Sequence, residues 1–272
     1  MDQNKCETIL YNIVNNVAHV TFNRPDVHNA FNDKMIHELS DVFDNIAQRQ
    51  DIRVVIITGK GKSFCAGADL NWMKCVKDYS YEDNLKGSFK LADMLYKIYA
   101  SPKPTIAKVN GTAIGGGTGL VAVCDIAIAS DRAKFSFSEV KIGLIPACIS
   151  PYVMKKCGEG RCREFFLTGE RLSAEKACNA GLINVVTPPD ELDKTVNDLV
   201  QRLLSSGPEA IAKCKELLRN VAEMSFEKAK SYTAEVIAQL RISDEGQEGM
   251  AAFFEKRNPK WDSDSGREKQ RS

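Results

Sequence analysis

Hydrophobic and polar positions follow two different periods along the first half of the chain. Four short apolar runs are typical of strands, at residues 17–22, 54–58, 105–109 and 126–129. The run at 54–58 is almost continuously apolar, as in a strand buried on both faces. Residues 32–48 carry apolar side chains at helical spacing behind Asn32 or Asp33 as the cap, and 81–99 suits a second helix. This alternation predicts an α/β core.

From about residue 159 onward the pattern favours helices alone. Ser173 is suited to cap a short helix that Gly181 ends, and Pro208 stands near the first position of another helix. Asp244 opens a sequence that resembles a capping box before a last apolar helix. These helices are too few for an independent domain, so we expect them to pack on the core or on a neighbouring subunit.

The chain therefore divides into three parts. We expect a core at residues 1–200, a helical oligomerisation region at 201–258, and a mobile polar tail at 259–272.

Composition excludes several classes of protein. The apolar fraction of 43% and charged fraction of 27% are those of an ordinary globular protein, and the net charge of +1 gives no reason to expect nucleic acid or a membrane as partner. No apolar run approaches the ~20 residues that span a bilayer. Residues 1–7 lack the apolar stretch of a signal peptide, so we expect no export.

Cysteine and histidine usage bounds the chemistry. Nine cysteines without a CxxC or zinc spacing indicate reduced thiols, hence a reducing compartment, and we expect a cytoplasmic protein. The chain has three histidines, His19, His28 and His37, all in its first fifth. Metal sites and Ser–His or Cys–His catalytic pairs usually need a histidine, so the sequence gives them little support. Cys65 is a weak candidate nucleophile because no histidine is close to it in sequence.

Two segments rich in small residues follow predicted strands. Ser63 to Leu70 allows close approach of a ligand to the backbone, although taken alone the segment is explained better by an ordinary tight turn with Asp69 in a first helical turn. Asn110 to Leu120 places a run of glycines between a strand and an apolar helix. Free N–H groups at such a helix start bind a phosphate or a developing oxyanion.

The glycine run also mimics a dinucleotide fingerprint. Gly117-x-Gly119-x-x-Ala122 has the right spacing, but the helix from about Gly117 to Cys124 is short for a Rossmann crossover. The only acidic residue near the expected distance, Glu139, lies beyond the following strand. Nucleotide binding is therefore disfavoured.

Glu139 is the candidate acid or base. It stands between Phe135-Ser136-Phe137-Ser138 and a mostly aliphatic segment, and burial among such neighbours raises the pKa of a carboxyl. A solvated acid beside Lys141 is the alternative.

Together these segments resemble the enoyl-CoA hydratase/isomerase (crotonase) superfamily, over about residues 17–256. The motifs, in family order, are Asn23-Arg24-Pro25 with Asn29-Ala30, Ala66-Gly67-Ala68-Asp69, Asn110-Gly111 with the glycine run and Cys124-Asp125, Phe137-x-Glu139-x-x-x-Gly143-x-x-Pro146, Leu167-Thr168-Gly169, Ala180-Gly181-Leu182-Ile183, and Glu248-Gly249-Met250 with Phe254-Glu255-Lys256-Arg257.

The resemblance implies an α/β fold, a crotonase-like spiral of β-β-α units with a C-terminal helical trimerisation region. It implies a homo-oligomer, a trimer or a hexamer built as a dimer of trimers. The catalytic residues become Glu139, with the backbone N–H groups of Ala68 and Gly116 as an oxyanion hole. No metal and no cofactor is implied beyond the coenzyme A of the acyl-CoA substrate. The residues implied to contact that substrate are Asp26, Val27, His28, Ala66, Asp69, Leu70, Gly119 and Lys256.

The sequence departs from the usual hydratase pattern at Gly119, where hydratases of the family carry a first glutamate that orients water. Glu139 matches the second. Pro146-Ala147-x-Ile149-Ser150-Pro151-Tyr152-Val153 resembles a narrower bacterial group, the 3-methylglutaconyl-CoA and isohexenylglutaconyl-CoA hydratases, whose substrates carry a second carboxylate.

We therefore expect an enoyl-CoA hydratase acting on an α,β-unsaturated thioester. The main alternative is a Δ3,Δ2-enoyl-CoA isomerase with Glu139 as sole acid/base, and a thioester hydrolase is the next. Two alternatives are not enzymes. One is a catalytically inactive scaffold, and the other is an RNA-binding module that would use four lysines: Lys74, Lys77, Lys155 and Lys156.

Overall fold

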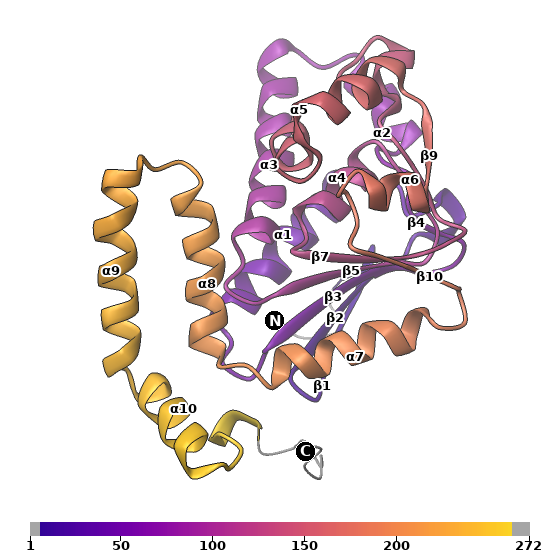
Figure 1. Ribbon diagram of the computed structural model, residues 1–272. Helices are drawn as coiled ribbons and strands as arrows, with labels where there is room; N and C mark the ends of the chain where they lie inside the picture. The colour runs from indigo at the N-terminus through magenta and orange to yellow at the C-terminus, as the bar shows by residue number, and fades with distance from the viewer. Residues whose placement is uncertain (1–5, 263–272) are drawn as a thin grey trace.

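The computed structural model describes residues 6–262 (Figure 1). Residues 1–5 and 263–272, which include much of the predicted tail, lie outside the described part. The strands form a six-stranded sheet in the order β1-β2-β3-β5-β7-β10 and a four-stranded sheet in the order β4-β6-β8-β9. The strands of the larger sheet are β1 (Ile9–Val14), β2 (Val17–Phe22), β3 (Val54–Gly59), β5 (Thr105–Val109), β7 (Ile126–Ser130) and β10 (Val185–Thr187). Those of the smaller sheet are β4 (Ser63–Cys65), β6 (Thr112–Ile114), β8 (Lys134–Ser136) and β9 (Arg171–Ser173).

The larger sheet has one antiparallel hairpin and is otherwise parallel. Asn15 and Asn16, with φ of 50° and 63°, make the turn between β1 and β2 in the left-handed conformation that a two-residue hairpin requires. Pairs β2–β3, β3–β5, β5–β7 and β7–β10 are parallel. The apolar runs predicted β2, β3, β5 and β7, and the structure confirms them.

Both faces of this sheet are covered by helices, as the continuous apolar character of β3 requires. Alternate residues of β3 face opposite sides. Val54 and Ile56 pack with α7 (Leu192–Leu204), while Val55 and Ile57 belong to the main core. Figure 1 shows α7 on one face, with α1 (Asp33–Gln48) and α3 (Tyr81–Ala100) on the other. The predicted α/β class is confirmed.

The cap predicted for the first helix is also confirmed. The side chain of Asn32 accepts a hydrogen bond of 3.1 Å from the N–H of Met35, which ties down one of the free amides at the start of α1. The apolar stripe of α1, which includes Met35, Leu39 and Ile46, is fully buried.

The smaller sheet is built from strands of only three residues, none of which we predicted. Each of β4, β6 and β8 follows a strand of the larger sheet after a short turn, and a helix comes after it. These helices are α2 (Leu70–Val76), α4 (Gly116–Val123) and α5 (Ser150–Thr168). The helix expected from about Gly117 begins at Gly116, directly after residues 112–114 have formed β6. The chain thus repeats a β-β-α unit.

Three corrections concern the second half. The region beyond residue 159 is not purely helical, because β9 and β10 lie within it, and α5 begins earlier, at Ser150. The last long helix is capped by Ser243, whose side chain accepts a hydrogen bond of 3.1 Å from Gly246, rather than by Asp244. The cap of the short helix α6 (Ala174–Asn179) is Ser173, as predicted.

Three long helices follow α7: α8 (Pro208–Val221), α9 (Phe226–Ile242) and α10 (Asp244–Glu255). The chain also has three short 3-10 helices among its described residues, η1 (Pro25–Val27), η2 (Ser138–Ile142) and η3 (Lys260–Asp262). In Figure 1, α9 and α10 stand away from both sheets. Lys215 fastens α8 to the core through an ion pair with Asp125 and a hydrogen bond of 3.0 Å to the Lys103 carbonyl. The three-part division of the chain stays a prediction.

No helix among residues 6–262 is both long and apolar enough to cross a membrane.

Candidate active site

The three predicted catalytic residues follow the carboxyl ends of three neighbouring strands of the smaller sheet. Strands β4, β6 and β8 are parallel neighbours in that order, so their carboxyl ends lie side by side, about 4.8 Å apart per strand. Ala68 comes three residues after β4, Gly116 two after β6, and Glu139 three after β8. Gly116 therefore takes the central place of the three.

The amide of Ala68 points away from its neighbouring strand. In the parallel bridge between Phe31 and Ala68, Phe31 N–H donates to the Gly67 carbonyl (2.8 Å) and Asp69 N–H donates to the Phe31 carbonyl (2.9 Å). Ala68 lies between Gly67 and Asp69, so its own N–H points to the side opposite Phe31. Gly116 is the first residue of α4, where an N–H has no carbonyl four residues earlier to bond. Both amides are thus available for a ligand.

Glycines allow these two segments to touch. A Cβ on Gly67, whose φ is 87°, would lie 3.6 Å from the Gly116 nitrogen. A Cβ on Gly117 would lie 2.0 Å from the Cys65 carbonyl oxygen, a distance that no side chain tolerates. The first turn of α4 therefore rests directly on the segment that carries Ala68.

Glu139 lies against the same turn of α4. It is half-buried, and its Oε2 is buried without a hydrogen-bond partner among the described residues. A Cβ on Gly115 would lie 3.1 Å from Glu139 Oε1. Burial raises the pKa of this carboxyl, and a bond to its own backbone lowers it by less. We expected a buried acid; Glu139 is half-buried, and its pKa is shifted in the expected direction.

Aromatic packing fixes the segment before Glu139. Phe137 is fully buried, with its ring centroid 5.0 Å from that of Phe166 and 6.4 Å from that of Phe165. The Glu139 carbonyl accepts a hydrogen bond of 3.0 Å from Leu144 N–H, which closes the loop around η2.

Gly119 faces Ile149, which belongs to the motif at residues 146–153 that resembles the narrower bacterial group. A Cβ on Gly119 would lie 2.0 Å from Ile149 Cγ2, and Ile149 is 3% exposed. The place for which the resemblance implies a first glutamate in other hydratases is therefore filled by an aliphatic side chain.

Asp69 has a structural task in addition to the predicted substrate contact. Its carboxylate caps α2 by accepting from Asn71 N–H (2.7 Å) and Trp72 N–H (3.3 Å), and it pairs with Arg24 at 2.7 Å. Burial raises the pKa of Asp69, but the hydrogen bonds from Arg24 and the two amides outweigh it and leave that pKa below its ordinary value.

The predicted coenzyme A contacts near the N-terminus lie together. Asp26, Val27 and His28 are exposed, and the His28 carbonyl accepts a hydrogen bond of 3.0 Å from Ala66 N–H. Leu70, the first residue of α2, is 74% exposed. These residues border the Ala68 edge of the site.

Lys256 is not brought to the site within one chain. It follows α10, which packs on α8 and α9 and lies apart from α2 and α4 in Figure 1.

Two other candidates lose support. Cys65 is fully buried, which raises the pKa of its thiol to about 12, so it is protonated and unreactive at neutral pH. Lys155 bonds Glu223 at 3.0 Å and the Lys156 ammonium is buried, so these two lysines do not offer a free basic patch to RNA.

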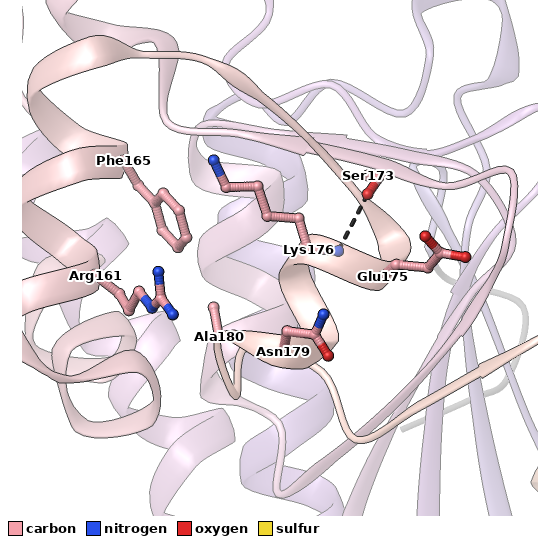
Figure 2. Close-up of a pocket in the computed structure, with 7 residues that line it drawn as sticks. All are labelled: Arg161, Phe165, Ser173, Glu175, Lys176, Asn179 and Ala180. Carbon is pink, nitrogen blue, oxygen red and sulfur yellow. Dashed lines mark hydrogen bonds between the residues drawn. The ribbon is translucent and has the colours of Figure 1, made fainter.

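A cavity elsewhere, between α5 and α6, has a volume of about 330 Å³ (Figure 2). It is lined by Arg161, Phe165, Ser173, Glu175, Lys176, Asn179 and Ala180, none of them a predicted site residue. Figure 2 shows the Lys176 side chain directed toward Phe165. Its ammonium bonds Glu164 at 2.7 Å and Glu170 at 2.8 Å, so its charge is already paired.

Comparison with known proteins decides the family. Residues 12–264 match the model of the enoyl-CoA hydratase/isomerase family. The chain belongs to the enoyl-CoA hydratase/isomerase family. The short-chain-enoyl-CoA hydratase of Clostridium acetobutylicum is 31% identical over 243 residues, 89% of this chain and 92% of that protein. This enoyl-CoA hydratase/isomerase family member is therefore an enzyme, with hydration the activity that its relatives' names support most.

Two solved structures confirm the crotonase fold. The enoyl-CoA hydratase of Shewanella pealeana has a TM-score of 0.92 at 39% identity, covering 95% of this chain and 97% of its own. An enoyl-CoA hydratase/isomerase of Marinobacter aquaeolei has a TM-score of 0.90 at 34% identity, covering 94% of this chain and all of its own. The spiral of β-β-α units with C-terminal helices, expected from the motifs, is thereby confirmed.

Proposed function

We propose that this protein hydrates an α,β-unsaturated acyl-CoA thioester. The observation that carries the proposal is the alignment of the β4, β6 and β8 ends, which gathers two backbone amides and a carboxylate whose Oε2 has no hydrogen-bond partner among residues 6–262. In the proposed complex, the thioester carbonyl accepts hydrogen bonds from Ala68 N–H and Gly116 N–H. Each such donor is typically worth about 3–4 kcal/mol of transition-state stabilisation as enolate charge develops.

Glu139 is the proposed acid and base. Its carboxylate removes a proton from water as the oxygen bonds to C3, and the carboxylic acid then delivers a proton to C2. Such general acid–base catalysis contributes roughly 10²–10⁴-fold. The raised pKa suits both steps, because it moves the carboxyl group toward the pH at which it can both take and give a proton.

The acyl group is proposed to be branched or to carry a distal carboxylate, as in methylglutaconyl-CoA. Support comes from residue 119, where a glycine packed against Ile149 supplies no second protein carboxylate, so that the ordering of water is left to a carboxylate of the substrate. A panel of 2-enoyl-CoA thioesters with and without a distal carboxylate tests this directly. Higher kcat/KM for unbranched, uncharged chains would contradict it.

The isomerase is the second candidate, because it needs only one carboxylate and the Gly119 position offers none. Incubation with 2-enoyl and 3-enoyl thioesters separates the candidates, since only hydration gives a 3-hydroxy product. We expect 3-hydroxyacyl-CoA from the 2-enoyl thioester. Conversion of the 3-enoyl thioester alone would favour the isomerase, and free coenzyme A would indicate a hydrolase.

The enzyme is proposed to act as a homotrimer or a dimer of trimers. The C-terminal helices expose large apolar side chains, with Phe226 at 97%, Ile242 at 81% and Phe254 at 77%. Burial of such side chains favours association. Light scattering should give a mass three or six times the 30.1 kDa chain, and a monomer would contradict the proposal.

A further inference from the structure

Two glycines stand four residues apart at the start of α4. Gly115 immediately precedes the helix and Gly119 follows one turn later, about 6 Å along the axis. A Cβ would make a tight contact at the first position and a severe clash at the second. At Gly115 that place is 3.1 Å from Glu139 Oε1, and at Gly119 it is 2.0 Å from Ile149 Cγ2. Glu139 and Ile149 therefore pack against the start of α4 at positions four residues apart.

The backbone of Ile149 is firmly held. It is the N-cap of α5, and its carbonyl accepts from Tyr152 N–H and Val153 N–H, each at 3.2 Å. The next residue, Ser150, donates its N–H to the Pro146 carbonyl at 3.0 Å. With only 3% of its surface exposed, the side chain has little freedom to withdraw from Gly119.

This arrangement gives the acid–base group an apolar neighbour. Glu139 Oε2 has no hydrogen-bond partner among the described residues, so water or substrate is left as its partner in catalysis. An isoleucine offers no hydrogen bond to a water molecule, and it occupies the volume in which a second water or polar group would stand.

We propose that Ile149 is a specificity-determining residue that sets the balance between water addition and proton transfer at Glu139. The inference rests on the proposed function. In hydration, the water oxygen bonds to C3 and a proton bonds to C2 of a 2-enoyl thioester. In isomerisation, Glu139 takes a proton from C2 of a 3-enoyl thioester and returns it to C4. Only hydration needs a positioned water, so the size of residue 149 acts on that reaction selectively.

The decisive experiment shortens this side chain. Ile149→Ala opens space beside Gly119, and we expect the ratio of hydration to isomerisation kcat/KM to rise about tenfold, the scale of discrimination that small changes of an apolar pocket produce. Ile149→Val should shift the ratio less. Ile46→Ala is the matched control, because Ile46 is fully buried in α1 and belongs to the large core rather than to the site.

A second pair of variants tests the geometry independently. Gly119→Ala should lower kcat for both reactions, because its Cβ must displace Ile149 or α4. In the Ile149→Ala background the Cγ2 contact at 2.0 Å is gone but the Cβ of residue 149 stays 2.7 Å from the new Cβ, so the same change should have a smaller effect, which a double-mutant cycle measures as coupling. If Ile149→Ala does not fold, Ile149→Val and Gly119→Ala still decide the question through the same two assays.

Failure of this inference differs from failure of the proposed function. An unchanged product ratio in folded Ile149 variants, or additive effects of Gly119→Ala and Ile149→Ala, would overturn the role of Ile149 while both activities persist. A wild-type protein without either activity would instead overturn the proposed function.

Discussion

Asp69 and Glu139 are two acidic residues that follow strands of the same small sheet, β4 and β8, yet their surroundings differ. The Asp69 carboxylate accepts hydrogen bonds from Arg24 and from two helix amides, and its pKa lies below the ordinary value. The Glu139 carboxylate has one buried oxygen without a partner among the described residues, and its pKa lies above the ordinary value.

This difference separates a carboxylate that holds the fold from one that is available for chemistry. A paired and bonded carboxylate stabilises its neighbours, and with its pKa lowered it is a poor base for a reactant. An unpaired, half-buried carboxylate lowers stability at neutral pH, and such groups gather at functional sites. The hydrogen bonds of Asp69 thus hold the neighbouring Ala68 in place, while the Glu139 carboxylate is left open to a reactant.

The largest expected effect is on turnover. Glu139→Gln keeps the shape of the side chain but removes its acid–base chemistry, so kcat should fall by about 10²–10⁴-fold. Affinity for a saturated acyl-CoA, measured by calorimetry, should stay near that of the wild type. Full activity in this variant would remove Glu139 from the mechanism.

Asp69→Ala should act on stability instead. It removes a helix cap and leaves the guanidinium of Arg24 without its partner, which should cost about 2–4 kcal/mol. Asp69→Asn should cost less, because asparagine caps helices well. Urea unfolding measures the change, with exposed Asp26→Ala expected to stay within about 0.5 kcal/mol as the control. Equal effects of Asp69→Ala and Asp26→Ala would remove the structural role.

The dependence of stability on pH should have opposite signs at the two residues. Because its folded pKa is raised, the stability contributed by Glu139 is fully present below the ordinary glutamate pKa and is lost as pH rises through the raised value. Glu139→Gln should therefore gain stability over the wild type near pH 7, and the gain should vanish in acid. Because the pKa of Asp69 is lowered, its contribution is present above the ordinary aspartate pKa and is lost as pH falls through the lowered value.

Unfolding midpoints of the wild type, Glu139→Gln and Asp69→Asn across a pH series measure both signs. The same profile for both variants would show that the two carboxylates do not differ as described.

The smallest effect is expected at Cys65, which lies on β4 below the first turn of α4. With a thiol pKa of about 12 it carries no thiolate at neutral pH, so Cys65→Ala should leave kcat close to that of the wild type. Loss of turnover in a folded Cys65→Ala protein would instead indicate that Cys65 acts as a nucleophile.

Long, regular elements were predictable from the sequence, and short ones were not. The helix capped by Asn32 and the strand at Val54–Gly59 carry enough residues for a helical or continuous apolar pattern to show. Strands of three residues, such as β4, β6 and β8, are too short for any period, and they exist because neighbouring strands supply their hydrogen bonds.

The sequence by itself determined the α/β class, the glycine-rich helix start and Glu139 as the candidate acid, because these are properties of local composition and of ordered motifs. Only the tertiary structure decided that Ala68, Gly116 and Glu139 share one edge, that Asp69 is bound to Arg24, and that Ile149 fills the space beside Gly119. The reason is physical: contacts across tens of residues depend on strand order and on packing volume, and neither leaves a periodic signal in the chain.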